Sequence, residues 1–107
     1  MYRCEGNWRS LDPDTAMRGV TSDMSREQLI EVAYGARCGA ARRIALVWLN
    51  DPGVTRTFAK EDPDPTVRRR LARSVDDAET LAYIIEHDTD TSVRDAAEKR
   101  LAEVNGA

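Results

Sequence analysis

The sequence predicts an all-α fold, in which about six short helices form a right-handed α-α superhelix of roughly three repeats. The first observation is an internal repeat, because residues 58–68 match residues 84–94 at a spacing of 26 residues. The match keeps two apolar residues, two Asp and a Val-Arg pair at the same offsets. The second observation is that no stretch alternates between apolar and polar residues with a period of two, so no strand is expected.

A third, degenerate copy of the repeat lies one period upstream. Arg42 stands 26 residues before Arg68, while Ala36 and Cys38 replace the two Asp of the other copies. Terminal repeats are often atypical because one of their faces has no neighbour, and about three repeats are needed for a stable stack. The sequence therefore predicts a short solenoid whose first unit differs from the other two.

The junction over residues 62–68, Asp-Pro-Asp-Pro-Thr-Val-Arg, resembles the loop-to-helix junction of HEAT-like repeats. The short period and residues 80–85 are similar to the leucine-rich repeat variant branch. This resemblance covers roughly residues 27–104 and implies a binding scaffold. Some leucine-rich repeat variant proteins hold an iron–sulfur cluster on a cysteine-rich N-terminal segment. The chain has only Cys4 there, so the resemblance implies no cluster, and no cofactor is expected.

At 107 residues the chain is long enough for one domain with a small core. Charged residues reach 33% and aromatic residues only 6%, which suits a thin helical stack with much surface. The net charge of −3 does not favour nucleic acid as a partner. Cys4 and Cys38 make no disulfide framework, so a cytoplasmic protein is expected.

Residues 1–6 lack the apolar core of a signal peptide, and no apolar run approaches the length of a membrane span, so no membrane partner is expected. Lys60 and Lys99 are the only lysines among the basic residues. This arginine bias is typical of a GC-rich coding genome, such as that of an actinobacterium or one of its phages.

Residues 1–24 are predicted to form an N-terminal extension or cap, irregular apart from one helical turn after Asp12-Pro13. The repeat domain is predicted over residues 25–107. Ser25 and Gln28 form a capping box, which predicts a helix over residues 26–34. A second helix over residues 39–50 is expected to turn four residues inward, namely Ala41, Ile44, Ala45 and Trp48.

Aspartate caps place the remaining helices. Asp51-Pro52 opens a short helix, and Asp64-Pro65 opens a helix over residues 65–74. Asp76 is the expected cap of a helix over residues 77–87, whose inward stripe is Ala78, Leu81, Ile84 and Ile85. Asp90 caps the last predicted helix, over residues 91–104.

A loop Asp and a helix Arg recur at one offset in successive repeats, as Asp62 with Arg68 and as Asp88 with Arg94. A charge-assisted bond between such residues, within or between repeats, is expected to hold the loops in place. The family resemblance implies that this pair is structural.

The densest basic cluster is Arg68-Arg69-Arg70 with Arg73. Because neighbouring apolar residues define the inner face of this helix, Arg69 and Arg73 are expected to point away from the core, one turn apart. Stacking in register would align cations into a basic stripe, interrupted by Asp95. The candidate partner-binding residues are therefore Arg43, Val47, Arg69, Arg73 and Lys99. The alternative interpretation is a solvated helix face, which most charge runs are.

The predicted helix over residues 39–50 is apolar nearly all round, since Leu46, Val47 and Leu49 add to its inward residues. A helix of that kind is buried on more than one side. Either the N-terminal segment or another chain should cover it. In the second case, Leu46, Val47 and Leu49 would form a homo-oligomer contact.

No metal, cofactor or catalytic site is predicted. The only His, His87, stands beside three carboxylates without the spacing of a calcium loop or a zinc site. Cys38 with His87 is formally a nucleophile pair, but Cys38 is expected to be a small buried residue. The P-loop, G-x-S-x-G and C-x-x-C motifs are absent, so the chain is not expected to be an enzyme.

The expected function is a non-catalytic protein-binding module that presents a helical-repeat surface to a macromolecular partner. The alternative is a HEAT-like nucleic-acid binder that uses the Arg-rich helix face. Salt dependence separates the two functions, because binding to phosphates weakens steeply as salt rises.

Overall fold

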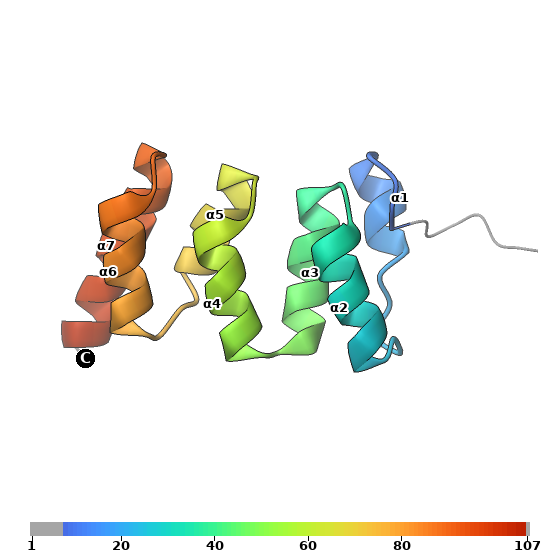
Figure 1. The fold of residues 1–107 in the computed structure, drawn as a ribbon, viewed down its shortest axis with the longest axis horizontal. Helices are drawn as coiled ribbons and strands as arrows, with labels where there is room; N and C mark the ends of the chain where they lie inside the picture. The colour runs from blue at the N-terminus through green and yellow to red at the C-terminus, as the bar shows by residue number, and fades with distance from the viewer. Residues whose placement is uncertain (1–7, 107) are drawn as a thin grey trace, which may run out of the picture. The chain divides into compact units, whose positions relative to one another are not determined.

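Seven helices and no strand make up residues 8–106, which are the residues that the computed structural model describes (Figure 1). Contacts within the chain divide it into two units, one up to Asp51 and one from Pro52 onward. This division falls inside the repeat domain predicted for residues 25–107 and groups the first helix with the next two. No helix in the described part of the chain is long and apolar enough to cross a membrane.

Three helices form the first unit: α1 (Pro13–Arg18), α2 (Arg26–Gly35) and α3 (Gly39–Leu49). α3 packs against both α1 and α2, so the segment before α2 covers part of α3, as the apolar surface of that helix predicts. Asp12 begins α1 by accepting a hydrogen bond from the Thr15 N–H at 2.9 Å. α1 ends at Gly19, which confirms the helical turn predicted there.

The capping box predicted for α2 is present. The Ser25 N–H donates to Gln28 Oε1 at 2.8 Å, and the Gln28 N–H donates to Ser25 Oγ at 3.2 Å. At the other end of α2, the ring of Trp8 lies against Gly35. Residues outside α2, Ser25 and Trp8, therefore contact its two ends.

The buried face of α3 differs from the predicted one. Ala45 is buried as expected, but Trp48, expected to point inward, is 50% exposed, and Leu46 is buried instead. The buried side chain of Arg42 explains this change, because its Nη1 donates to the carbonyl oxygen of Ala36 at 2.8 Å. Arg42 occupies part of the inner face, and Leu46 lies one turn further along that face.

Four helices form the second unit: α4 (Pro52–Glu61), α5 (Pro65–Ala72), α6 (Ala78–His87) and α7 (Thr91–Gly106). They form two helical hairpins, α4–α5 and α6–α7, which pack with α4 against α6 and α5 against α7. Figure 1 shows α4 and α6 on the near side of this unit and α5 and α7 behind them. The unit thus has two layers, and the second layer, α5 and α7, carries the candidate site.

Residues one period apart in the second unit are buried alike. The 26-residue repeat implies that matching apolar positions are buried in both copies, and three such pairs are: Phe58 with Ile84, Val67 with Val93, and Leu71 with Ala97. In the two pairs whose residues differ in size, the larger residue, Phe58 or Leu71, belongs to the α4–α5 hairpin. The burial predicted from the 26-residue register is therefore confirmed for these positions.

α6 begins one residue later than predicted, and its cap is Asp77 rather than Asp76. The Asp77 carboxylate accepts hydrogen bonds from both the N–H and the hydroxyl of Thr80. Asp76 pairs instead with Arg100 of α7. Because the helix begins later, Ala78 lies in its exposed first turn and does not face the core as expected.

Three cap carboxylates have lowered pKa values. The Thr80 hydroxyl lowers the pKa of Asp77, with a smaller contribution from the Thr80 N–H. The Ser92 hydroxyl, followed by the Val93 N–H, lowers the pKa of Asp90. At Asp12 the largest cause is the Thr15 N–H. In each case the hydrogen bonds favour the ionised carboxylate, so ionisation of these groups is coupled to folding.

Leu81→Ala is expected to destabilise the second unit strongly, because Leu81 is fully buried. Truncation of a buried Leu costs about 2–5 kcal/mol, against a total stability of about 5–15 kcal/mol for a domain. Thermal melts monitored by circular dichroism measure the effect. Leu11→Ala is the matched control, since Leu11 is 69% exposed. Equal melting temperatures for the two variants would show that Leu81 does not belong to the core.

Acid is expected to destabilise the protein as the pH falls below about 4, where the cap carboxylates become protonated. Their pKa values are lower in the folded state, so the stabilisation is present above the unfolded pKa and is lost as the pH falls through the folded one. Asp77→Asn retains a good cap but does not titrate. Urea unfolding between neutral and acid pH should therefore give a shallower pH dependence for Asp77→Asn. An unchanged pH dependence would contradict the coupling at Asp77.

Candidate functional site

The two hairpin loops of the second unit contain the same hydrogen bonds at a spacing of 26 residues. Asp62 Oδ1 accepts from the Asp64 N–H at 2.9 Å, and Asp88 Oδ1 accepts from the Asp90 N–H at 2.9 Å. The second Asp of each loop then caps the following helix, α5 or α7. The Asp-x-Asp sequence therefore specifies a tight loop that sets the start of the next helix.

An arginine at the same register position donates from Nη1 to the carbonyl oxygen six residues earlier. This bond joins Arg42 to Ala36 at 2.8 Å, Arg68 to Asp62 at 2.7 Å, and Arg94 to Asp88 at 2.7 Å. The acceptor is a main-chain atom, so the bond persists in the degenerate copy, where Ala replaces Asp. The recurrence of this bond is independent of the loop carboxylates.

The sequence left open whether the Asp–Arg bond forms within a repeat or between repeats. In the structure it forms between repeats, because the carboxylate partner of Arg68 is Asp88 and not Asp62. Arg68 Nε lies 2.8 Å from Asp88 Oδ2, and Arg68 Nη2 lies 3.3 Å from Asp88 Oδ1. The side chains are 14% and 4% exposed, so the pair is largely buried. The ion pair thus acts between repeats: it fixes α5 against the loop that begins α7.

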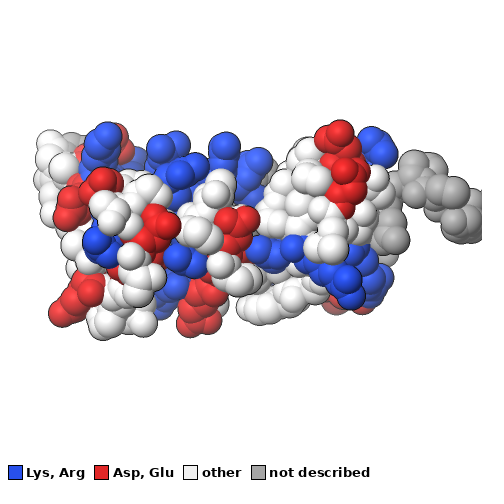
Figure 2. All heavy atoms as spheres, turned by 90° about the horizontal axis from the view of Figure 1, so that it is seen from above, with Lys and Arg blue, Asp and Glu red and all other residues white. Residues whose placement is uncertain are grey.

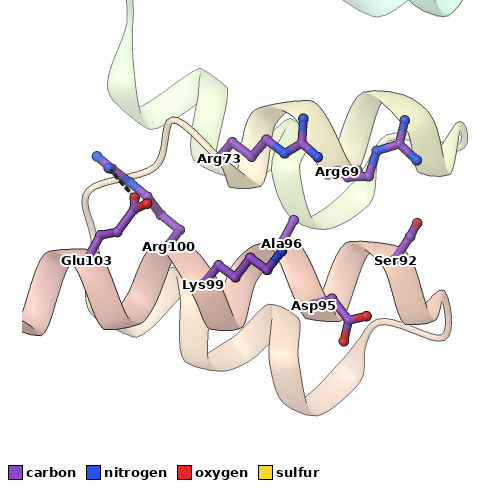
Figure 3. A pocket seen from close by; sticks show the side chains of 8 residues that line it. All are labelled: Arg69, Arg73, Ser92, Asp95, Ala96, Lys99, Arg100 and Glu103. Atoms are coloured by element: carbon purple, nitrogen blue, oxygen red, sulfur yellow. Dashed lines mark hydrogen bonds and ion pairs between the residues drawn. The ribbon is translucent and has the colours of Figure 1, made fainter.

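A groove of about 490 Å³ lies between α5 and α7 (Figure 3). Two arginines four residues apart, Arg69 and Arg73, form the wall on the α5 side. The other lining residues come from α7, and they are Ser92, Asp95, Ala96, Lys99, Arg100 and Glu103. The structure therefore brings three of the predicted partner-binding residues, Arg69, Arg73 and Lys99, to one groove.

Arg100 is already paired at one end of the groove. Its Nε donates to the Val75 carbonyl oxygen at 2.9 Å, and its guanidinium pairs with Glu103 at 3.1 Å and with Asp76. Glu103 and then Asp76 raise the pKa of Arg100. Arg100 therefore joins α7 to the segment between α5 and α6 and contributes little free charge to the groove.

Arg69, Arg73 and Lys99 have no ion-pair partner among residues 8–106. Asp95 also lines the groove, but Figure 3 shows its carboxylate pointing away from both arginines. The Nε of Arg69 is shielded from solvent and lacks a hydrogen-bond partner in the described structure. A buried donor left unsatisfied costs about 1–3 kcal/mol. The groove therefore presents three positive charges without an ion-pair partner in the described structure.

The groove contrasts with the charge of the chain as a whole. Figure 2 shows Lys and Arg side chains gathered along one edge of the second unit, while Asp and Glu side chains are scattered over the rest of the visible face. The net charge of the chain is −3. The cations along this edge therefore give a local positive charge on a chain that is acidic as a whole.

The other two predicted partner-binding residues belong to the first unit. Arg43 and Val47 lie on α3, where Val47 is 62% exposed and Arg43 is half-buried. A single stripe that joins them to Arg69, Arg73 and Lys99 stays a prediction.

The apolar residues proposed for self-association do not form one surface. Leu46 is 2% exposed, Leu49 is half-buried, and only Val47 is well exposed. Trp48, which the sequence placed in the core, lies on the surface beside Val47. Leu46 packs inside the unit, so it is not available for a contact with a second copy.

His87 is engaged in local contacts. Its Nδ1 lies 3.0 Å from the Tyr83 carbonyl oxygen, and the two rings stack with centroids 4.1 Å apart. Within residues 8–106, no group of three His, Cys, Asp or Glu side chains is placed to hold a metal ion. Cys38 is half-buried at the start of α3, and Cys4 lies outside the described residues.

The sequence analysis did not predict four residues of the groove, namely Ser92, Ala96, Arg100 and Glu103. They share a face of α7 with Lys99, since these positions follow a helical spacing of three and four residues. The helical period of α7 was therefore sufficient to find them. Comparison of the chain with family models, with curated proteins and with solved structures returns no match.

Arg68 and Asp88 are expected to be coupled in a double-mutant cycle. Removal of one partner of a buried ion pair costs about 3–5 kcal/mol, so Arg68→Met and Asp88→Asn should each destabilise, and the double mutant should cost less than their sum. Urea unfolding measures the coupling. The exposed pair Arg9–Glu31 is the control, with an expected coupling below about 1 kcal/mol. A coupling for Arg68 and Asp88 no larger than this control would contradict the account.

Proposed function

We propose that the chain is a non-catalytic binding module and that its α5–α7 groove binds an acidic segment of a partner protein. One observation supports this proposal above the others: Arg69, Arg73 and Lys99 line one groove and have no ion-pair partner in the described part of the chain. Cations at such positions gain little from internal pairing, so carboxylates of a partner are their natural counter-charges.

We also propose that the chain is a helical-repeat scaffold of the HEAT-like type, closest to the leucine-rich repeat variants. The recurrence of the arginine-to-carbonyl bond at Arg42, Arg68 and Arg94 supports this proposal. Scaffolds of stacked helices present extended helix faces to macromolecules. Arg43 and Val47 on α3 are proposed as further partner-binding residues, and the cytoplasm is the proposed compartment.

Charge favours a protein partner over nucleic acid. Three unpaired cations neutralise about three phosphates, whereas proteins with strong electrostatic binding to duplex DNA make about 6–10 phosphate contacts. The net charge of −3 adds repulsion between a long polyanion and the rest of the chain. A short acidic peptide segment avoids most of that repulsion because it contacts only the groove.

Reversal of two groove charges tests the proposal. Arg69→Glu with Arg73→Glu is expected to lower the affinity for a labelled Glu-rich peptide at least about tenfold, since like charges now oppose each other. The thermal melt should stay close to that of the wild type, because neither residue is in the core. Fluorescence anisotropy at two salt concentrations measures binding.

The matched control reverses two exposed arginines outside the groove, Arg37 and Arg70, and should keep binding within about threefold. Full binding of the peptide by the Arg69→Glu, Arg73→Glu variant would overturn the proposal. Tighter binding of an oligonucleotide of equal charge, with a steep salt dependence, would favour the nucleic-acid alternative instead.

A further inference from the structure

The two arginines of the groove have a spacing that suits an α-helix. Arg69 and Arg73 are four residues apart, and Figure 3 shows both side chains along the same side of the groove. Residues at i and i+4 on a helix have Cβ atoms about 5–6 Å apart. A helix that lies along α5 and carries acidic residues at i and i+4 therefore meets both arginines in register.

The molecule itself shows how such an arginine binds a carboxylate. Arg68 holds Asp88 through Nε and Nη2, at 2.8 Å and 3.3 Å. Arg69, the next residue, has an Nε that is shielded from solvent and has no acceptor in the described structure. Because this Nε is shielded, a partner carboxylate would meet the guanidinium of Arg69 through its terminal nitrogens, as a charge-assisted pair.

The opposite wall of the groove adds a third charge and a small floor. Lys99 projects from α7, and Figure 3 shows Ala96 pointing toward α5 between the two walls. Ala96 is 7% exposed, so this part of the groove is formed by a small, largely buried residue. An incoming helix thus finds cations on both sides and a methyl group beneath it.

A helix suits this groove better than an extended segment does. The main-chain groups of α5 and α7 are used within those helices, so the groove offers side chains only. An extended peptide gains affinity by pairing its backbone with a sheet edge, which is absent from the described structure. A helix satisfies its own backbone and needs only side-chain contacts.

We propose that the occupant of the groove is an acidic α-helix of a partner protein, with carboxylates at i and i+4 bound to Arg69 and Arg73 and a further carboxylate at Lys99. This inference rests on the proposed function and specifies the partner segment. The chain has one acidic pair at this spacing on a surface helix, Glu27 and Glu31 of α2, but Glu31 is paired with Arg9. The segment is therefore assigned to a different protein.

Peptides of identical composition test the spacing. One Ala-based helical peptide carries Glu pairs at i and i+4, and the second carries them at i and i+2, on opposite faces of the helix. Circular dichroism is used to check that the two peptides are equally helical. The wild-type protein is expected to bind the first peptide with a Kd about tenfold lower than that of the second peptide.

Four variants connect that preference to the groove. Arg69→Gln and Arg73→Gln should each remove it, whereas Arg70→Gln should keep it, since Arg70 is exposed and does not line the groove. Arg69→Lys keeps the charge but loses the planar guanidinium, so it should weaken the first peptide several-fold and leave the second peptide unchanged.

The outcomes separate this inference from the proposed function. Equal affinity for the two peptides, lost in Arg69→Gln, would overturn the helical spacing and keep the acidic partner. Failure of the wild-type protein to bind either peptide would overturn both. Concentration-dependent dimerisation that Glu27→Gln abolishes, measured by sedimentation, would assign the groove to a second copy and overturn the inference of a different protein.

Discussion

The buried ion pair between Arg68 and Asp88 joins α5 to the loop that begins α7. The same guanidinium also donates to the carbonyl oxygen of Asp62, so one side chain joins the loop before α5, α5 itself and the loop before α7. Asp88 is held in turn, because its Oδ1 accepts from the Asp90 N–H and its carbonyl oxygen accepts from Arg94. The two walls of the groove are therefore fixed in one register, and the cations on those walls lie opposite each other as a consequence.

Neighbouring arginines on α5 have different physical roles. Arg68 points toward α7 and is satisfied by a carboxylate and a carbonyl, so its loss leaves a buried charge unpaired. Arg69, turned by about 100° on the helix, lines the groove without an acceptor for its Nε in the described structure. Arg70 is exposed and outside the groove. Three consecutive residues of one type therefore divide into a structural, a groove and a surface position, and the helical rotation alone separates them.

Local sequence signals predict most of the helices and part of the site. The Asp-Pro pairs and the Ser25 capping box place helix starts, and the 26-residue register places Arg69, Arg73 and Lys99 on equivalent faces. The errors involve distant partners. Asp76 and Asp77 are both able to cap α6; in the structure Asp77 caps it, and Asp76 pairs with Arg100, 24 residues away.

The predicted inward position of Trp48 is also wrong, because the buried Arg42 occupies part of the inner face of α3.

A titration of isotope-labelled protein with the i, i+4 acidic peptide, followed by NMR of the arginine Nε–Hε groups, tests the central claim most directly. The account predicts that the signals of Arg69 and Arg73 shift on binding, while that of Arg68 stays in place. Shifts confined to other residues, such as Arg43 on α3, would contradict the assignment of the α5–α7 groove as the binding site.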